Sequence, residues 1–128
     1  MAANGLAQSL AARIAVLAGA GKAYPVRIPE DATLPAVVYQ QIGGERGATH
    51  SGDAGPHRTR WQVTTWAASY SAAKELAATL VAGLNTWTDT SGTHVTDAVA
   101  FVEGEVDLFD EDSQLYYVPI EVTMLHVP

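Results

Sequence analysis

The chain has no cysteine among its 128 residues. This absence excludes disulfide bonds, thiol nucleophiles and cysteine-based zinc sites. The apolar runs are all too short to cross a membrane, and we expect no membrane partner. Residues 6–16 have the apolar character of a signal peptide, but Arg13 interrupts them and no basic residue precedes them. We therefore expect no export signal.

Basic residues are missing from the second part of the chain. All seven lie at or before Lys74, whereas ten of the 14 acidic residues lie from Glu75 to Glu121. The first part therefore carries a charge of about +3 and the second about −10, for a net charge of −7. This asymmetry favours a surface whose basic side meets the acidic side of another copy, in a ring or a filament. The alternative is a fold that interleaves the two parts, so that the asymmetry has no function.

Length and composition indicate one globular domain. A chain of 128 residues can bury one core but not two, so we expect a single domain over residues 1–128. The hydrophobic fraction of 48% and the charged fraction of 16% are typical of a folded domain. A net charge of −7 argues against affinity that depends on nucleic acid phosphates.

Apolar periodicity predicts two helices and four strands. Residues 4–17 and 71–85 repeat apolar side chains at spacings of three and four, and Ser71 is the expected cap of the second helix. Strands are expected at residues 36–42, 59–67, 94–102 and 115–127. The order α-β-β-α-β-β predicts an α+β fold of two layers, in which a mostly antiparallel four-stranded sheet packs against two helices. Pro119 lacks an N–H, so we expect the last strand to lie at a sheet edge or to be bulged.

The segment of residues 43–57, GGERGATHSGDAGPH, is unusually polar and glycine-rich. Its length exceeds that of a minimal hairpin turn, and long loops in compact domains are usually functional or disordered. We interpret it as a flexible loop that becomes ordered against a partner, and the alternative is a solvated loop without a task. The candidate contact residues are Gly43, Gly44, Glu45, Arg46, Gly47, His50, Asp53 and His57.

Catalytic and metal-binding motifs are incomplete. The sequence GAGK at residues 19–22 lacks the first glycine and the final Ser or Thr of a phosphate-binding loop. His50, Ser51, Asp53 and His57 include the residue types of a hydrolytic triad, but they share one glycine-rich loop without rigid support. The acidic residues 103–112 lack the glycine that an EF-hand requires at its sixth position. We expect no enzyme activity, no cofactor and no metal.

Three stretches together resemble a known family. They are LPAVVYQQIGGER (residues 34–46), RTRWQVTTWAASYSAAKELAATLVAGLN (residues 58–85) and LYYVPIEVTML (residues 115–125). Their order and spacing resemble the tail-completion proteins of long-tailed phages, which are the tail terminator or tail-to-head joining proteins of siphophages. The resemblance covers most of the chain.

The resemblance implies a non-enzymatic protein of the virion. Such proteins form a ring, commonly of six copies, which caps the tail tube, stops its polymerisation and joins it to the head connector. The implied partners are further copies of the chain, the tail tube protein and a head connector or stopper protein, while DNA passes through the lumen without specific binding. The implied place is the tail–head junction, after assembly in the host cytoplasm.

Within such a ring, basic side chains are expected to meet the acidic turn of the adjacent copy. The candidate subunit-interface residues are Arg27, Arg58, Arg60, Asp107, Asp110, Glu111 and Asp112. Two alternatives remain open. One is a head-completion adaptor or stopper of the same neck, and the other is a small-ligand-binding module on a ferredoxin-like sheet, whose Tyr- and Trp-rich strands would line a pocket.

Overall fold

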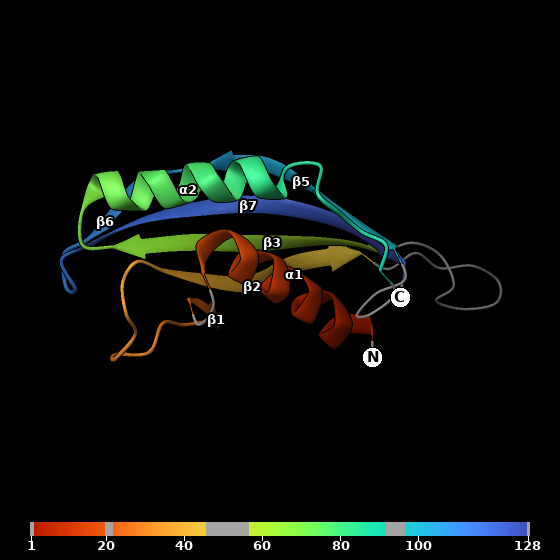
Figure 1. The fold of residues 1–128 in the computed structure, drawn as a ribbon, viewed down its shortest axis with the longest axis horizontal. Helices are drawn as coiled ribbons and strands as arrows, with labels where there is room; N and C mark the ends of the chain where they lie inside the picture. The colour runs from red at the N-terminus through yellow and green to blue at the C-terminus, as the bar shows by residue number, and fades with distance from the viewer. Residues whose placement is uncertain (1, 20–21, 46–56, 92–96, 128) are drawn as a thin grey trace.

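The structure is a computed structural model that describes residues 2–19, 22–45, 57–91 and 97–127. In this part of the chain, helices α1 (Ala2–Ala18) and α2 (Tyr70–Leu84) lie on the same face of one sheet (Figure 1). The strands of the sheet are β1 (Ala23–Pro25), β2 (Ala36–Glu45), β3 (His57–Ala67), β4 (Thr88–Asp89), β5 (Asp97–Glu105), β6 (Leu108–Asp110) and β7 (Leu115–Val127).

The predicted four-stranded sheet and the order α-β-β-α-β-β are wrong. The described residues form seven strands in a mixed sheet of order β1-β2-β3-β7-β5-β4, and β6 also pairs with β7. The β1–β2 pair is parallel and the other pairs are antiparallel. The missed strands β1, β4 and β6 have only two or three residues, too few for an alternating pattern to be recognised. Backbone pairing with a longer neighbour defines them instead.

Helix α1 forms because its apolar residues share one face. Leu6, Leu10 and Ile14 are fully buried against the sheet and α2. The helix stops at Gly19, whose φ of 110° is in the region that favours glycine, and the Gly19 N–H donates to the Ala15 carbonyl at 3.0 Å.

The two helices approach closely at Gly83. A Cβ atom added there would clash with the side chain of Leu17 on α1. The guanidinium of Arg13 donates two hydrogen bonds, of 2.9 and 3.1 Å, to the Gly83 carbonyl. This carbonyl lies in the last turn of α2, where intrahelical donors are missing, so Arg13 both satisfies it and joins the helices.

Helix α2 begins earlier than the sequence suggests. Ser69, not Ser71, is the N-cap, and its Oγ accepts a hydrogen bond of 3.2 Å from the Ala72 N–H. The buried face of the helix consists of Ala73, Ala77, Leu80 and Leu84.

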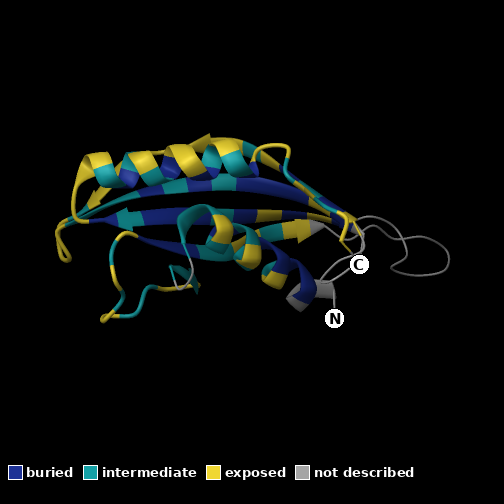
Figure 2. Ribbon diagram, viewed as in Figure 1, coloured by how far each residue is buried: buried dark blue, intermediate teal, exposed yellow. Residues whose placement is uncertain are grey.

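Strands β3 and β7 form the middle of the sheet and supply most of the core residues that the sheet contributes. The alternate residues of β3 that include Trp61, Val63 and Thr65 are buried under the helices, as are Val118 and Ile120 of β7 (Figure 2). Arg58 and Arg60 point to the other face and are exposed. The alternation of Trp61 and Val63 with Arg58 and Arg60 along β3 therefore matches the side of the sheet that each side chain faces.

The predicted edge position of the last strand is wrong, because β7 pairs with β3 on one side and with β5 and β6 on the other. The Pro119 carbonyl accepts a hydrogen bond of 3.2 Å from the Val106 N–H. Because N–H and C=O of a strand residue point to the same side, the missing proline donor also faces β5 and β6. Pairing changes there from Glu105 of β5 to Leu108 of β6, so the ladder tolerates a proline.

Candidate functional site

The face of the sheet opposite the helices is accessible in the part of the chain that the structure describes. Two partly apolar regions lie on it. Near the start of β3, Phe101 and Leu125 are 38% and 37% exposed, next to Arg58 and Arg60. An open sheet face is usually polar, so this apolar pair is a candidate contact surface.

The second region is a hollow of about 480 Å³ at the other end of this face. Trp66 of β3 and Tyr117 of β7 stack there, with ring centroids 4.4 Å apart and an interplanar angle of 12°. Residues 26–28, which follow β1, form one wall, and Leu108 of β6 forms another. The candidate interface residue Arg27 also lines the hollow and is exposed. Flat aromatic rings beside an arginine can bind an aliphatic or aromatic side chain of a partner.

Arg60 extends towards β2. A Cβ atom at Gly43 would lie 2.6 Å from a terminal nitrogen of the Arg60 guanidinium, so this group occupies the space left by the missing side chain. Gly43, Gly44 and Glu45, predicted as loop contacts, lie within β2, and His57 is the first residue of β3. The other predicted loop contacts lie outside the described residues: Arg46, Gly47, His50 and Asp53.

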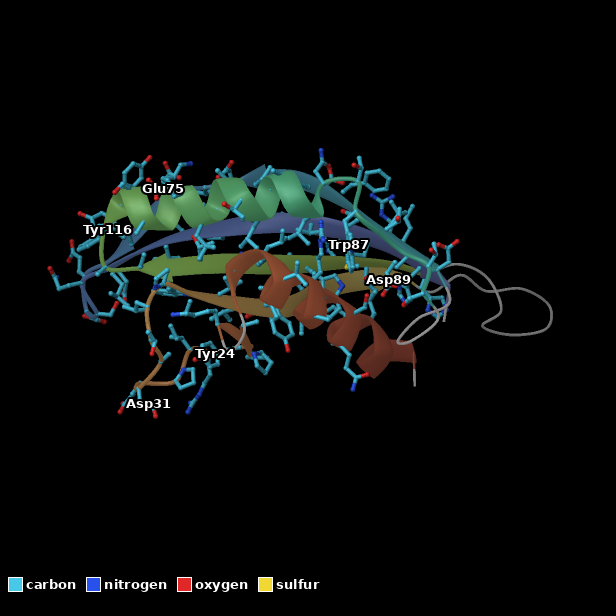
Figure 3. All side chains as sticks on the ribbon, in the orientation of Figure 1. Tyr24, Asp31, Glu75, Trp87, Asp89 and Tyr116 are labelled. Atoms are coloured by element: carbon cyan, nitrogen blue, oxygen red, sulfur yellow. The ribbon has the colours of Figure 1, made fainter. Side chains whose placement is uncertain are left out.

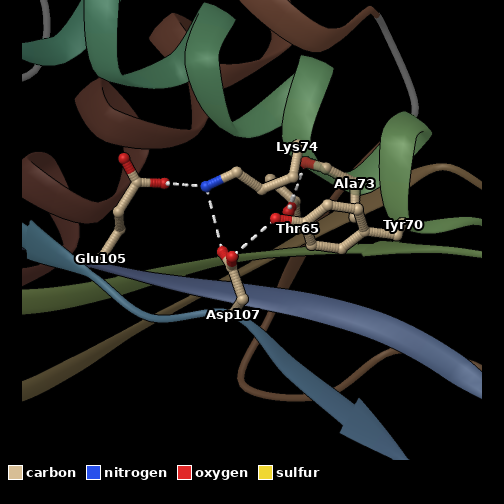
Figure 4. A network of polar contacts seen from close by, with 6 residues as sticks. All are labelled: Thr65, Tyr70, Ala73, Lys74, Glu105 and Asp107. Atoms are coloured by element: carbon tan, nitrogen blue, oxygen red, sulfur yellow. Dashed lines mark hydrogen bonds and ion pairs between the residues drawn. The ribbon is translucent and has the colours of Figure 1, made fainter.

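A network of polar contacts joins α2 to the segment between β5 and β6 (Figure 4). Lys74 forms ion pairs with Glu105 at 3.3 Å and Asp107 at 3.0 Å, and the Tyr70 hydroxyl donates to Asp107 at 2.8 Å. The hydrogen bonds from Tyr70 and Lys74 lower the pKa of Asp107, and the bond to Asp107 raises the pKa of Lys74. Asp107 is thus already paired within its own chain. Here the fold interleaves the basic and acidic parts of the sequence.

The remaining acidic candidates lie at the end of β6 and in the turn that leads to β7. Asp110 accepts two hydrogen bonds from Ser113, at 2.6 Å from the hydroxyl and 3.3 Å from the N–H. Glu111 and Asp112 are exposed. This turn lies at the end of the sheet where β3 finishes, whereas Arg58 and Arg60 lie where β3 starts (Figure 1). One protomer therefore does not bring its two predicted interface groups together.

A buried histidine pair was missed in the sequence. His57 and His126 are 8% and 4% exposed, and their rings meet edge to face at 5.2 Å between centroids. Nε2 of His57 and Nδ1 of His126 have no hydrogen-bond partner among the described residues. Burial, together with the charge of His57, lowers the pKa of His126. Both residues fall on inward positions of their strands, and this alternation was the available signal.

The segment that follows the C-terminal end of α2 contacts α1. Trp87 and Asp89 lie beside α1 (Figure 3). The Arg13 guanidinium carbon lies 5.8 Å from the centroid of a Trp87 ring, and the Ser9 hydroxyl donates to an Asp89 carboxylate oxygen. These contacts hold α1 against the segment that follows α2.

No group of three or more His, Cys, Asp or Glu side chains that could hold a metal ion is found in the part of the chain that the structure describes. No helix among those residues is long and apolar enough to cross a membrane. The described residues define a helix-backed β-sheet protein in which the face opposite the helices is open.

The family model described as "Tail completion protein gp17" matches residues 4–126, so the chain belongs to this family. Membership confirms the predicted tail-completion family and the virion as its location. No curated protein matches the chain. Among solved structures, a chain of the "Virion of native gene transfer agent (GTA) particle" has the same fold, with a TM-score of 0.59 and 12% identity over 90% of this chain and 84% of that chain.

Proposed function

We propose that this protein is a tail terminator, a structural protein that forms a ring on the end of the tail tube, stops the addition of tube subunits and joins the tube to the head connector. The role requires no catalysis or cofactor. The observation that supports it most directly is the sheet face without helices, with its stacked Trp66–Tyr117 pair and the Phe101–Leu125 patch. Such a surface suits protein partners that are themselves part of an ordered assembly.

A ring on a symmetric tube end benefits from multivalency. Each copy binds one tube subunit and two neighbouring copies, so the contacts of one copy raise the effective concentration for the next. Individually weak contacts are then sufficient for a stable cap. Six copies would match a six-fold tube, and the proposed ring is a hexamer.

The charge distribution suits a channel for DNA. The protein has a net charge of −7, so surplus acidic groups in the lumen repel the phosphates of passing DNA. DNA would then move through the ring without binding to it.

The proposed ion pairing of Arg58 and Arg60 with residues 110–112 of the next copy stays a prediction. The two groups lie at opposite ends of the strands, so copies that stand side by side would hold them at different levels. This placement favours a second arrangement, in which the turn of residues 110–112 faces the tube or the connector. Gly43 and Gly44 of β2, which pair with the start of β3, lie at the other end and would face the opposite partner.

Binding to isolated neck components tests the function. The proposal predicts that the purified protein sediments with cognate tail tubes and, more weakly or only after capping, with connector complexes. Binding to portal complexes without any binding to tubes would instead assign the protein to head completion, as an adaptor or stopper.

A further inference from the structure

Among the residues that the structure describes, no strand pairs with the outer edge of β2 in its second half. Strand β1 pairs with β2 only as far as Tyr39, whose carbonyl also accepts the Val26 N–H at 2.9 Å. Backbone groups alternate sides along a strand, so the N–H and C=O of Gln41 also point outward. After the register shift between Gln41 and Gly43, those of Gly44 do so too. None of these groups has a backbone partner among the described residues.

Strand β5 has a matching open edge on the far side of the sheet. Strand β4 reaches only Val99, and Ala100 exchanges hydrogen bonds with the segment after α2. The Val102 N–H donates to the Asn85 side chain at 3.2 Å. The Val102 carbonyl and, beyond the register shift that follows Val102, the backbone groups of Glu105 point outward with no partner in the described part of the chain. Exposed edges of this kind are templates for pairing with another strand.

The directions of the two edges are compatible with a ring. Each successive pair in the series β2, β3, β7 and β5 is antiparallel, so β5 runs opposite to β2. Rotation about an axis along the strands keeps these directions, and β2 of one copy therefore meets β5 of the next in antiparallel orientation. The series of four strands can therefore repeat from copy to copy with every neighbouring pair antiparallel.

We propose that the open edge of β2 in one copy pairs with the open edge of β5 in the next, so that a single sheet continues around the ring. The outward groups fit in one register, with Gln41 opposite Glu105 and Gly44 opposite Val102, whose carbonyl is open to the Gly44 N–H while its own N–H stays bonded to Asn85. Both edges contain one extra residue between these positions, so the two irregularities face each other. This register displaces the neighbour by two residues, and a sheet that closes on itself requires such a stagger. The inference rests on the proposed ring and specifies its subunit contact.

Charge complementarity supports the same pairing. The Arg60 guanidinium lies over Gly43, between the two outward positions of β2. Glu103 lies between the corresponding positions of β5, is exposed, and has no ion pair among the described residues. The proposed register places this carboxylate beside Arg60 of the neighbouring copy. A positive edge and a negative edge also disfavour the pairing of two identical edges.

Cysteine cross-linking tests the register, because the chain has no native cysteine. In the double variant Gln41→Cys, Glu105→Cys, the two positions of adjacent copies would be directly opposite, at a Cα distance of about 5.5 Å that a disulfide can span. Both residues are exposed. Glu105→Cys removes one ion pair of Lys74, and the ion pair of Lys74 with Asp107 remains. The matched control is Gln41→Cys, Thr79→Cys, because Thr79 is an exposed residue of α2 away from the edge. The samples are oxidised at high concentration and on tube ends, and then separated under non-reducing conditions.

The expected result is a ladder of covalent oligomers that ends at the ring size, disappears on reduction and is absent from the control. Native mass spectrometry of the reduced variant measures the ring independently. A closed ring without a ladder overturns the edge pairing and leaves the terminator intact. A ladder without any binding to tubes supports the edge pairing and contradicts the terminator. Absence of both ring and ladder, on tube ends as well as in solution, overturns both.

Discussion

At Gly83 the packing of the two helices leaves no space for a side chain. The Leu17 side chain of α1 fills the space where a Cβ would project. Gly83→Val should therefore lower the free energy of unfolding by about 1–3 kcal/mol through overpacking. Gly104→Val is the matched control, because nothing lies within 4 Å of a Cβ at that strand position, and valine favours strands. Urea denaturation measures both, and equal stability of the two variants would contradict the close helix contact.

The buried histidine pair predicts a pH dependence of stability. The folded state lowers the pKa of His126 below its ordinary value of 6.5, so the unfolded chain binds more protons in that range. The free energy of unfolding should therefore fall as the pH decreases from above 6.5 towards the lowered pKa, and should change no further through this group at lower pH. His126→Phe removes the titrating group. Urea denaturation between pH 7.5 and 5.5 should give a smaller loss for this variant than for the unmodified protein, and equal losses would refute the assignment.

At the scale of elements, two serines near the start of α2 can be compared as its N-cap. Both Ser69 and Ser71 are possible caps in the sequence, but only Ser69 accepts the Ala72 N–H. Ser69→Ala should lower the free energy of unfolding by about 1 kcal/mol. Ser71→Ala, at an exposed position inside the helix, should change it by less than about 0.5 kcal/mol. Thermal denaturation of the two variants checks the difference, and a larger effect at Ser71 would contradict the cap.

The long elements could be predicted from the sequence, because their patterns are local. Leu6, Leu10 and Ile14 mark the buried face of α1 by helical spacing, and β7 has the predicted bounds. The position of β7 in the sheet could not be predicted, because a proline removes one donor without revealing which side of the strand it faces. The short strands depend on partners far apart in the sequence, so no local pattern marks them.

The sequence identified residues of the candidate site by their charge, but it could not predict how these residues are arranged. Arg58 and Arg60 were identified by charge, and the structure places both on the exposed sheet face. The pairing of Lys74 with Asp107 removes one predicted acidic partner, because α2 passes over the end of β5. The sequence could not place Glu103 at a sheet edge, because β5 extends to Glu105 and the predicted strand ends at residue 102.

At the scale of the whole molecule, charge reversal distinguishes two modes of association. Arg60→Glu should weaken the ring, because it removes an ion pair between copies. The stability of the remaining ring should then depend less on the salt concentration, because salt screens an exposed ion pair. If the edges pair, Glu103→Arg restores the ring of the Arg60→Glu variant. If Arg60 meets the acidic turn, reversal of Asp110 and Asp112 restores it instead. Native mass spectrometry of the double variants at low and high salt measures which rescue occurs.

The most direct test of the terminator is the growth of tail tubes in the presence of the protein, followed by electron microscopy. Tubes are assembled from cognate tail tube protein, with and without the purified chain, and their lengths and ends are compared. The account predicts a ring at one end of each tube and an arrest of growth, with weaker arrest by Trp66→Ala, which removes the half-buried aromatic stack. Tubes that grow to the same length with bare ends would contradict it.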